Sequence, residues 1–548
     1  MNSNQMMQSA ANAVRQGQHQ QAERLLIEVL KEQPGLLQAR WLLVQAYEGL
    51  QQNSHASDQI DIMLASLMGD LPAINQLAAH VLQQGYPLDA VLRAFSGYLA
   101  THPGSADAIF NYAYHLAKDG QFEKAVKNYA QALKLGIAQP EEVHLNIANV
   151  YMDHLHNNRK ARAHLQEALA LNPRYANAWF NLGNLAEQRG QRDEAKSSFE
   201  KCLRFDPLNH TALARLADAH KFDSLSDPLL ARLNSAAHGS NNSDIHFALA
   251  KVYEQCDDFE SAWQYYSKAN KLDAIAFPPY NRQATENYFQ TIKSRCTTQW
   301  LKQYKGKSHQ TVFICGMFRT GSTLLEQMLA AHPNFFPGGE SEFFPRLIAK
   351  LFRQYPQGLD SLRPPQLLAW KKQQRVQSSQ VAAGTRRLTD KRPDNFLYLG
   401  LIKAVLPSAK FVITQRDWRD VATSVFCTRL GPQQNYATNL SDIRHYLGLQ
   451  QDLIDHWAEL FGQDLMRLDY EQLVTDPEPT ISRLLNNLGE TWDERCLRFD
   501  QLDNTVKTAS VWQVREPLST KSIGRWKNYF GHFEEIFGDQ IKSQNKAQ

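Results

Sequence analysis

The 548-residue sequence lacks the hallmarks of several protein classes. Its six cysteines are far apart and form no C-x-x-C pair, which argues against a zinc site and against a disulfide framework. No stretch reaches the ~18 uninterrupted apolar residues of a membrane-spanning helix, and the N-terminus has neither a basic nor an apolar leader region. The sequence therefore predicts a soluble, cytoplasmic protein with reduced thiols and no membrane span.

The sequence also lacks a large excess of positive or negative charge. The formal net charge is +3, which is small for this length, and the chain has no long block of Lys or Arg. This balance gives little support to nucleic-acid binding or to polybasic attachment at a membrane, although local basic pockets are compatible with it. The chain is too long for one hydrophobic core, so two or more domains are expected.

The first half of the sequence is repetitive. The stretch "AWFNLGNLAEQRGQRDEAKSSFEKCLRFDP" (178–207) has its small, aromatic and proline positions spaced as in a tetratricopeptide repeat, and Pro173 precedes Pro207 by the expected 34 residues. Looser copies carry Ala10, Ala22, Leu26 and Pro34, then Ala113, Ala125, Tyr129 and Ala132, and finally Ala250, Ala262, Tyr266 and Ala269. An α-helical solenoid over most of residues 1–290 is predicted. These positions are packing residues and do not identify a ligand, but solenoids commonly bind a protein or peptide on their concave face.

The second half has a different pattern. The runs 311–315, 410–414 and 465–470 are typical of strands, and 322–332 is typical of a helix that Pro333 stops. Such alternation predicts an α/β domain with a parallel sheet covered by helices. We therefore expect a repeat domain over 1–295 and an α/β domain over 296–548.

The stretch "GMFRTGST" (316–323) has the outline of a phosphate-binding P-loop but lacks its lysine, because Ser322 takes that place. The glycines Gly316 and Gly321 alone fit a simple turn between a strand and a helix equally well. The guanidinium of Arg319 and the hydroxyls of Ser322 and Thr323 favour anion binding at the helix N-terminus. Without a Walker lysine, a donor with a shorter anionic chain and no compulsory metal is favoured over ATP or GTP.

Five blocks in order extend this pattern: "GMFRTGSTLLEQMLAAHPNFFPGGE", "DKRPDNFLYLGLI", "VITQRDWRDVATSVF", "LDYEQLVTDPE" and "TASVWQVREPLSTKSIGRW". Together they resemble the sulfotransferase domain of bacterial tetratricopeptide-repeat sulfotransferases, and more distantly the tyrosylprotein sulfotransferases. The resemblance implies a P-loop-like sulfotransferase fold that uses 3′-phosphoadenylyl sulfate as co-substrate, with no metal expected. The reaction would be transfer of a sulfuryl group to a hydroxyl or amine.

The resemblance also implies roles for single residues in donor binding. The 5′-phosphosulfate would be held by Arg319, Thr320, Gly321, Ser322 and Thr323. The 3′-phosphate would be held by Arg416 and Ser424, and the remaining donor contacts would come from Tyr470, Ser510 and Arg525, where relatives have lysine in place of Arg525. The segment "RDWRD" fits a charged helix start equally well, with Asp417 and Asp420 near its N-terminus.

For catalysis, the resemblance implies Glu340 as the proton acceptor when the flanking His-Pro and Pro-Arg pairs are aligned without a gap. Glu342 is the rival base. Lys391 and Ser510 would stabilise the departing phosphate and Arg319 the sulfated end of the donor, although Lys391 also fits a surface ion pair. Relatives that act on acidic peptides have arginine where this chain has Glu342, so specificity for protein tyrosine is not carried over.

The sequence leaves the acceptor open between a protein, for example at a tyrosine, a glycan, a lipid and a small metabolite. The repeats would recruit the acceptor or a partner protein. Two alternatives remain. One is a repeat-based adaptor whose nucleotide-binding domain is inactive, and the other is a P-loop kinase using ATP, which the missing Walker lysine disfavours.

Overall fold

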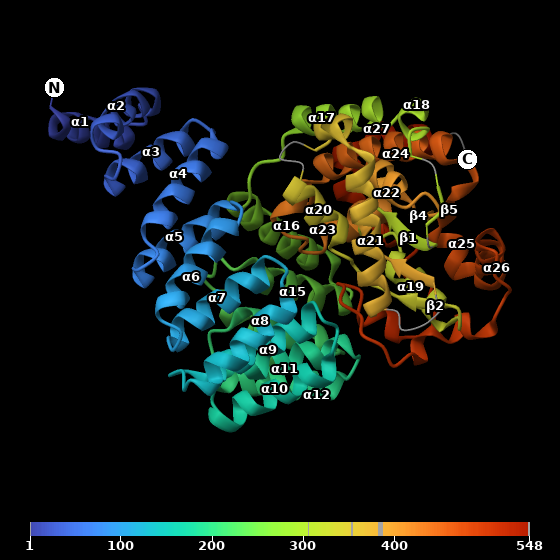
Figure 1. Cartoon of the computed structure of the whole chain (residues 1–548). Helices are drawn as coiled ribbons and strands as arrows, with labels where there is room; N and C mark the ends of the chain where they lie inside the picture. Colours follow the sequence, from blue (N-terminus) through green and yellow to red (C-terminus); the bar gives the residue numbers. More distant parts are fainter. Residues whose placement is uncertain (1, 305, 309, 352–354, 382–386, 546–548) are drawn as a thin grey trace. The chain divides into compact units, whose positions relative to one another are not determined.

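The computed structural model describes residues 2–304, 306–308, 310–351, 355–381 and 387–545 (Figure 1). The chain divides into two compact units, Met1–Ala178 and Trp179–Gln548. Within the described ranges, no helix is both long enough and apolar enough to cross a membrane.

The first unit is built of successive helices, drawn in blue to cyan in Figure 1. The small residues predicted to pack, such as Ala10, Ala22, Ala113 and Ala125, are fully buried. Its helices are α1 (Ser3–Arg15), α2 (His19–Glu32), α3 (Leu37–Gly49), α4 (Asn53–Ser66), α5 (Leu71–Gln84), α6 (Asp89–Thr101), α7 (Ala106–Lys118), α8 (Phe122–Lys134), α9 (Pro140–Asp153) and α10 (Asn158–Leu171).

The repeats continue into the second unit. A Cβ on Gly183 would lie 2.4 Å from Cε1 of Phe199, so only glycine permits the close approach of these two helices. The helices are α11 (Ala176–Gln188), α12 (Arg192–Phe205), α13 (His210–Ala219), α14 (Pro228–Ala237), α15 (Ser243–Gln255), α16 (Phe259–Ala276), α17 (Arg282–Arg295) and α18 (Thr298–Leu301). The predicted helical repeats are thus confirmed.

A five-stranded parallel sheet follows, with the order β2-β3-β1-β4-β5. Its strands are β1 (Thr311–Gly316), β2 (Phe335–Pro337), β3 (Arg387–Asp390), β4 (Lys410–Gln415) and β5 (Leu465–Asp469). Every residue of β1 is buried, as expected for the central strand of a sheet covered on both faces. The strands predicted at 311–315, 410–414 and 465–470 are confirmed, except that the third ends at Asp469 and Tyr470 begins a helix. β2 and β3 were not predicted.

Helices cover both faces of this sheet. The remaining ones are α19 (Ser322–Ala331), α20 (Phe343–Leu351), α21 (Pro364–Val381), α22 (Leu399–Val405), α23 (Trp418–Phe426), α24 (Leu440–Phe461), α25 (Tyr470–Thr475), α26 (Pro477–Leu488) and α27 (Phe530–Asn545). Short 3₁₀ segments used below are η2 (Pro393–Leu397), η3 (Pro432–Thr438), η5 (Glu494–Gln501), η6 (Gln513–Arg515) and η7 (Arg525–Tyr529).

Alternate residues of β1 enter different cores. Phe313 packs in a cluster with residues of α17, α22 and α24, whereas Ile314 packs with residues of α19 and α26. The first cluster includes Phe289 and Ile292 of α17, which lie before the expected boundary at 295/296. That boundary stays a prediction. Because all five strands are parallel, the loops after them meet at one edge of the sheet, where open α/β sheets bind ligands.

Candidate functional site

The loop after β1 is shaped by its two glycines. Gly316 has φ 148° and Gly321 has φ 88°, and a Cβ on Gly321 would lie 2.5 Å from Cδ2 of Tyr470. The Thr320 hydroxyl is paired with the carbonyl of Met317 and the hydroxyl of Thr414, each at 2.7 Å, so it fixes the loop to β4. The backbone N–H groups that begin α19 have no partners within the helix, as an anion site requires.

The two hydroxyls that begin α19 are both buried, Ser322 at 6% and Thr323 at 7% exposure. The hydroxyl of Thr323 is hydrogen-bonded to that of Thr508 at 3.3 Å. This contact joins the loop to the segment that carries Ser510. Both predicted residues therefore lie at the N-terminus of α19, where hydroxyls can supplement backbone donors to an anion.

Arg319 is held in the left-handed region with φ 72°, which is unfavourable for a residue with a side chain. Its guanidinium donates from Nε to Ser424 Oγ at 3.1 Å, from Nη1 to Ser510 Oγ at 2.5 Å and from Nη2 to Gln513 Oε1 at 3.1 Å. Three predicted donor residues are thus brought into direct contact. Gln513 in η6 completes the set and was not predicted.

Arg416 follows β4 and lies beside the P-loop. Its Nη1 donates to the carbonyl of Arg319 at 3.3 Å, and its guanidinium lies 4.7 Å from the ring centroid of Tyr470. An ion pair of 3.7 Å joins it to Asp420, and both side chains are almost fully buried. The ring of Tyr470 therefore fills the space between Gly321 and Arg416, so the predicted Tyr470 does pack at the site.

Arg525 begins η7, and its side chain is directed at a carboxylate of the repeats. Its Nε and Nη2 each donate to an oxygen of Glu254 in α15 at 2.6 Å. Asp420 accepts from the backbone N–H groups of Gly524 at 2.6 Å and Trp526 at 3.0 Å, which fixes the backbone around Arg525. Asp417 accepts from the N–H of Arg419 at 2.8 Å and caps α23. The charged helix start is therefore real, and it coexists with the arginine contacts.

Arg319, Arg416 and Arg525 form what we call the arginine cluster. Burial, together with the charges of Arg525 and Arg416, lowers the pKa of Arg319 to about 10. The buried Nε of Arg416 has no hydrogen-bond acceptor among the described residues. Like charges that repel one another, with a donor left unsatisfied, fit a site that binds an anion of more than one charge.

The loop after β2 and the end of β3 carry the predicted catalytic pair. Lys391 is only 1% exposed, and its Nζ donates to Glu340 Oε1 at 2.6 Å. Glu342 instead accepts from Nη2 and Nε of Arg346 at 2.9 and 3.0 Å, so its charge is balanced. Because Lys391 is buried, its ion pair with Glu340 is not the surface ion pair that the sequence left as an alternative. Of the two rival bases, Glu340 is the one in contact with Lys391.

Glu326 of α19 is a buried residue that the sequence reading missed. Its Oε1 accepts from the N–H of Gly339 at 3.0 Å and from the hydroxyl of Thr389 at 2.9 Å. Burial raises the pKa of Glu326, and Lys391 opposes this shift. The carboxylate therefore ties the loop that carries Glu340 to the P-loop helix. A signal was present, because Glu326 shares the apolar face of the predicted helix with Leu325 and Leu329.

Asp390 closes β3 next to Lys391 and is 4% exposed. Burial raises the pKa of Asp390 to about 8, although Asn395 donates to Oδ1 at 3.0 Å and opposes the shift. The unfolded carboxyl titrates near ~4. Between these values the folded state binds the proton and the unfolded state does not, so the contribution of Asp390 to stability falls as the pH rises.

We therefore expect Asp390→Asn, which mimics the protonated carboxyl, to raise the free energy of unfolding at pH 8 by about 1–3 kcal/mol and by much less at pH 4.5. Urea unfolding of both proteins at the two pH values measures this. The exposed Asp469, which ends β5, is the matched control, and Asp469→Asn should change little at either pH. An equal shift for Asp390→Asn at both pH values would contradict the assignment.

A cavity of about 610 Å³ lies next to these residues. Phe318 of the P-loop, Glu342 and Arg392 line it, so it adjoins both the donor loop and the Glu340–Lys391 pair. The other lining residues are Tyr280, Thr285, Pro345, Arg346, Ala349, Asp394, Leu397, Tyr398, Gln433, Gln434, Asn435, Tyr436 and Tyr446. Arg392 is paired with Asp394 at 2.8 Å. The cavity is therefore rich in aromatic rings, and its charges are paired.

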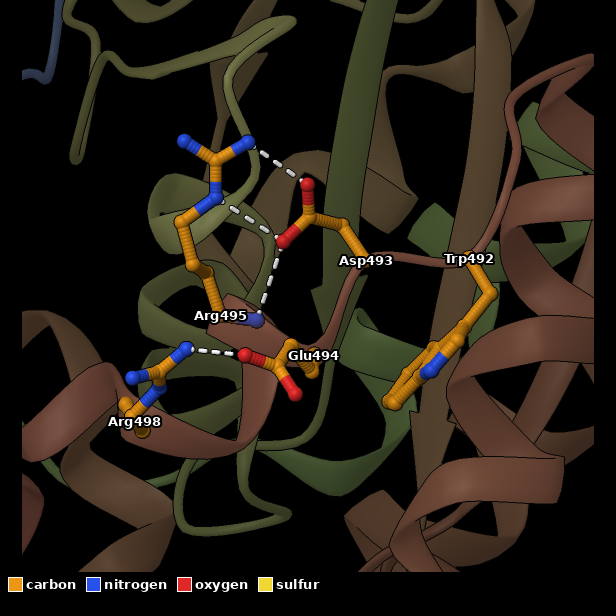
Figure 2. A pocket seen from close by; sticks show the side chains of 5 residues that line it. All are labelled: Trp492, Asp493, Glu494, Arg495 and Arg498. Carbon is orange, nitrogen blue, oxygen red and sulfur yellow. Dashed lines mark hydrogen bonds and ion pairs between the residues drawn. The ribbon is translucent and has the colours of Figure 1, made fainter.

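A second hollow of about 540 Å³ lies at the start of η5 and is lined by Trp492 and four charged residues. Figure 2 shows that these charges pair with each other: Asp493 with Arg495 at 2.6 Å, and Glu494 with Arg498 at 2.5 Å. None of the predicted site residues lines it. Among the described residues, no group of three or more His, Cys, Asp or Glu side chains is arranged to hold a metal ion.

Comparison with known proteins agrees with both parts of the chain. Residues 311–494 match the family described as "Sulfotransferase family", and residues 176–209 and 243–275 match tetratricopeptide-repeat families. An uncharacterized protein of Aquifex aeolicus (strain VF5) is 27% identical over 382 residues, covering 67% of this chain and 50% of that protein.

Other relatives match over shorter stretches of the chain. Protein-tyrosine sulfotransferase A of Caenorhabditis elegans is 24% identical over 243 residues, covering 39% of this chain and 60% of that protein. The chain thus spans less than two thirds of either curated relative. The solved sulfotransferase domain of the Synechococcus PCC 7002 olefin synthase has a TM-score of 0.32 at 20% identity, covering 41% of this chain and 89% of that domain. The chain contains a sulfotransferase-family region and tetratricopeptide repeats, as predicted.

Proposed function

For a chain that joins a sulfotransferase-family region to tetratricopeptide repeats, we propose transfer of a sulfuryl group from 3′-phosphoadenylyl sulfate to a hydroxyl or amine. The observation that carries this proposal is the arginine cluster beside a P-loop without lysine. Three guanidiniums around one loop suit a donor with two separate anionic groups better than a linear triphosphate, whose charge is met by a Walker lysine and a metal.

The chain's own residues divide the work of donor binding. The N-terminus of α19, with Ser322 and Thr323, would hold the phosphate next to the sulfate, and Arg319 would meet the sulfated end. Arg416, Ser424 and Arg525 would hold the second phosphate. The hydroxyls of Ser424 and Ser510 already lie against Arg319, so they can donate to the same anion that its guanidinium binds. The donor supplies an activated sulfuryl group.

Glu340 and Lys391 would serve the transfer itself. Glu340 accepts the proton of the acceptor hydroxyl while the oxygen of that hydroxyl bonds to sulfur. The bond between sulfur and the phosphate oxygen breaks, and Lys391 with Ser510 stabilises the charge left on that oxygen. The 2.6 Å hydrogen bond from Lys391 to Glu340 supports this assignment, because it places the proposed base and the proposed cation side by side.

We assign acceptor binding to the 610 Å³ cavity, because Phe318, Glu342 and Arg392 each lie within two residues of a proposed catalytic or donor residue. Its volume is in the range of small-molecule sites. The ion pair of Glu342 with Arg346 removes the strong repulsion of acidic acceptors that the sequence alone suggested. The repeats would recruit the acceptor or a partner protein through their concave face.

Ligand-induced stabilisation tests the donor. Adenosine 3′,5′-bisphosphate at 100 times its dissociation constant is expected to stabilise the folded protein by about 2.7 kcal/mol, if it binds only the folded state. Thermal unfolding with the bisphosphate and, in parallel, with Mg·ATP measures this. Stabilisation by Mg·ATP alone would favour the kinase alternative, and stabilisation by neither would favour the adaptor.

A further inference from the structure

The last repeat hairpin reaches into the arginine cluster. Glu254, near the C-terminal end of α15, accepts two hydrogen bonds of 2.6 Å from Nε and Nη2 of Arg525. The hydroxyl of Tyr266 in α16 donates to the same carboxylate at 2.8 Å. Both partners of the ion pair are mostly buried, with side-chain exposures of 23% and 17%. The Glu254 carboxylate is therefore held by Tyr266 of its own hairpin and accepts from Arg525, a proposed donor-binding residue.

The contact with Glu254 occupies only one edge of the Arg525 guanidinium. Arginine has five N–H donors in a rigid plane, and Glu254 takes two of them along the Nε–Nη2 edge. Among the described residues, no second carboxylate is hydrogen-bonded to the end formed by Nη1 and the second Nη2 hydrogen, although the buried thiol of Cys427 lies close to this guanidinium. That end can therefore bind another anion. Because Asp420 holds the backbone on both sides of Arg525, the residue is constrained at its backbone and at its side chain.

The charge of Glu254 does not cancel the arginine cluster. Burial by itself raises the pKa of this carboxyl, but the charge and hydrogen bonds of Arg525 lower it overall, so the group is ionised at neutral pH. One carboxylate faces Arg525, and another, Asp420, lies 3.7 Å from Arg416. The three guanidiniums of the arginine cluster and these two carboxylates together carry a net positive charge. Glu254 is thus a partner of one arginine and not a substitute for the anion.

An earlier repeat hairpin contacts a second segment of the proposed donor site. The carbonyl of Gln188 in α11 accepts from the N–H of Val506 at 2.9 Å and from Arg515 Nη2 at 3.4 Å. The guanidinium of Arg192 in α12 lies 4.5 Å from the ring centroid of Trp512. This segment carries Ser510 and Gln513, two of the three acceptors of Arg319. The repeats therefore support two of the segments around the arginine cluster.

A third contact lies at the end of α23, the helix that carries Ser424. Asn270 of α16 donates to the carbonyl of Phe426 at 2.8 Å, and the ring of Trp263 stacks on Phe426 with centroids 4.9 Å apart. Residues of α15, α16, α23, η3, η7 and α27 share one buried cluster. The hairpin α15–α16 is consequently packed as part of the sulfotransferase region.

From these contacts we infer that Glu254 is a positioning residue for the donor site: the repeat hairpin α15–α16 orients Arg525 so that its free end binds a phosphate of the donor nucleotide. This inference rests on the proposed function, in which Arg525 is a donor residue. It adds that the last repeat belongs to the nucleotide site, in addition to any role in recruiting a partner.

The repeats offer a matched control. Glu254 stands eight residues before the buried Ala262, and Glu48 stands eight residues before the buried Ala56, so the two glutamates share one repeat position. Among the residues that the structure describes, Glu48 is hydrogen-bonded only within the repeats. It accepts from His80 Nε2 at 2.7 Å and from the Tyr86 hydroxyl at 2.9 Å. The same substitution at both positions therefore separates loss of a repeat contact from loss of the contact with Arg525.

The experiment measures the Kd of adenosine 3′,5′-bisphosphate by calorimetry on the full chain. Glu254→Gln keeps the shape and an acceptor but loses the charge, and we expect about tenfold weaker binding. Glu48→Gln is expected to leave the Kd unchanged. In an Arg525→Ala background, Glu254→Gln should cause no further loss, because its effect passes through the missing guanidinium.

Each other outcome overturns the inference. Unchanged or tighter binding by Glu254→Gln would show that the carboxylate does not position Arg525 for the anion. Equal losses in Glu254→Gln and Glu48→Gln, or a tenfold loss that persists in the Arg525→Ala background, would show a general structural effect. If Glu254→Gln does not fold, Tyr266→Phe, which frees the carboxylate, should weaken binding about threefold, and no change would decide against the inference. A wild-type protein that binds no bisphosphate would refute the proposed function itself.

Discussion

Glu340→Gln is expected to lower kcat for sulfuryl transfer by about 10²- to 10⁴-fold, the range measured for loss of a general base. Glutamine keeps the shape of the side chain and an oxygen that can accept from Lys391, which donates to Glu340 at 2.6 Å. It cannot take the proton of the acceptor hydroxyl. The Kd of adenosine 3′,5′-bisphosphate should stay within about threefold of the wild type, because the proposed donor contacts come from segments other than the loop that carries Glu340.

The control for this experiment is Glu342→Gln. Glu342 lies two residues away and is paired with Arg346 at 2.9 Å, so the same change removes an ion pair of the cavity rim and leaves the contact with Lys391 intact. We expect a change in kcat of about threefold or less, as for a partly exposed ion pair. Loss of transfer in Glu342→Gln with full activity in Glu340→Gln would reverse the assignment of the base.

Arg319→Lys is expected to weaken binding of adenosine 3′,5′-bisphosphate by about 10- to 100-fold. Lysine keeps the positive charge but cannot donate at once to Ser424, Ser510 and Gln513, the three acceptors of the guanidinium. These acceptors come from two segments far apart in the sequence, so the planar fork also holds the site together. Calorimetric titration of both proteins gives the ratio of dissociation constants.

Arg346→Lys is the corresponding control, because Nε and Nη2 of Arg346 both donate to Oε2 of Glu342 and Arg346 is not one of the proposed donor residues. Its Kd for the bisphosphate should equal that of the wild type. If Arg319→Lys binds as tightly as the wild type, positive charge alone suffices at this position. The proposed role of the arginine fork would then be wrong.

The parts of the fold that follow from the sequence are those with strong local patterns. β1 and β4 each contain a run of apolar residues, and such runs indicate buried strands whatever their partners are. β5, with the sequence LMRLD, is apolar at three of its five positions and is partly buried. The repeat positions were predictable because small residues recur at a fixed spacing, and their burial follows from close helix packing. The parallel arrangement followed from the alternation of strands and helices.

Two strands could not be predicted this way. β2 has three residues and β3 has four, with the mixed sequence "RLTD", so neither shows a periodicity of its own. Their pairing depends on the register with β1, which no local pattern fixes. The burial of Lys391 follows from its place directly after β3, and the sequence alone left it open to a surface ion pair.

The site shows the same division between local and long-range information. Glu326 could have been found, since a glutamate on the apolar face of a predicted helix must have buried partners. The contact between Glu254 and Arg525 joins residues 271 positions apart, and the repeat pattern predicts only packing at that position. Sequence reasoning therefore identified Arg525 as a candidate donor residue but not the carboxylate that holds it.

The most direct test of the central claim is transfer of label from 3′-phosphoadenylyl sulfate carrying radioactive sulfur. The purified full chain is incubated with this donor and with separated protein, glycan, lipid and small-molecule fractions of a cell lysate, beside Glu340→Gln as the matched protein. We expect label in an acceptor fraction with the wild type and at least 100-fold less with Glu340→Gln, the lower bound for loss of the base. Equal labelling by the two proteins, or none by a wild type that binds the bisphosphate, would contradict it.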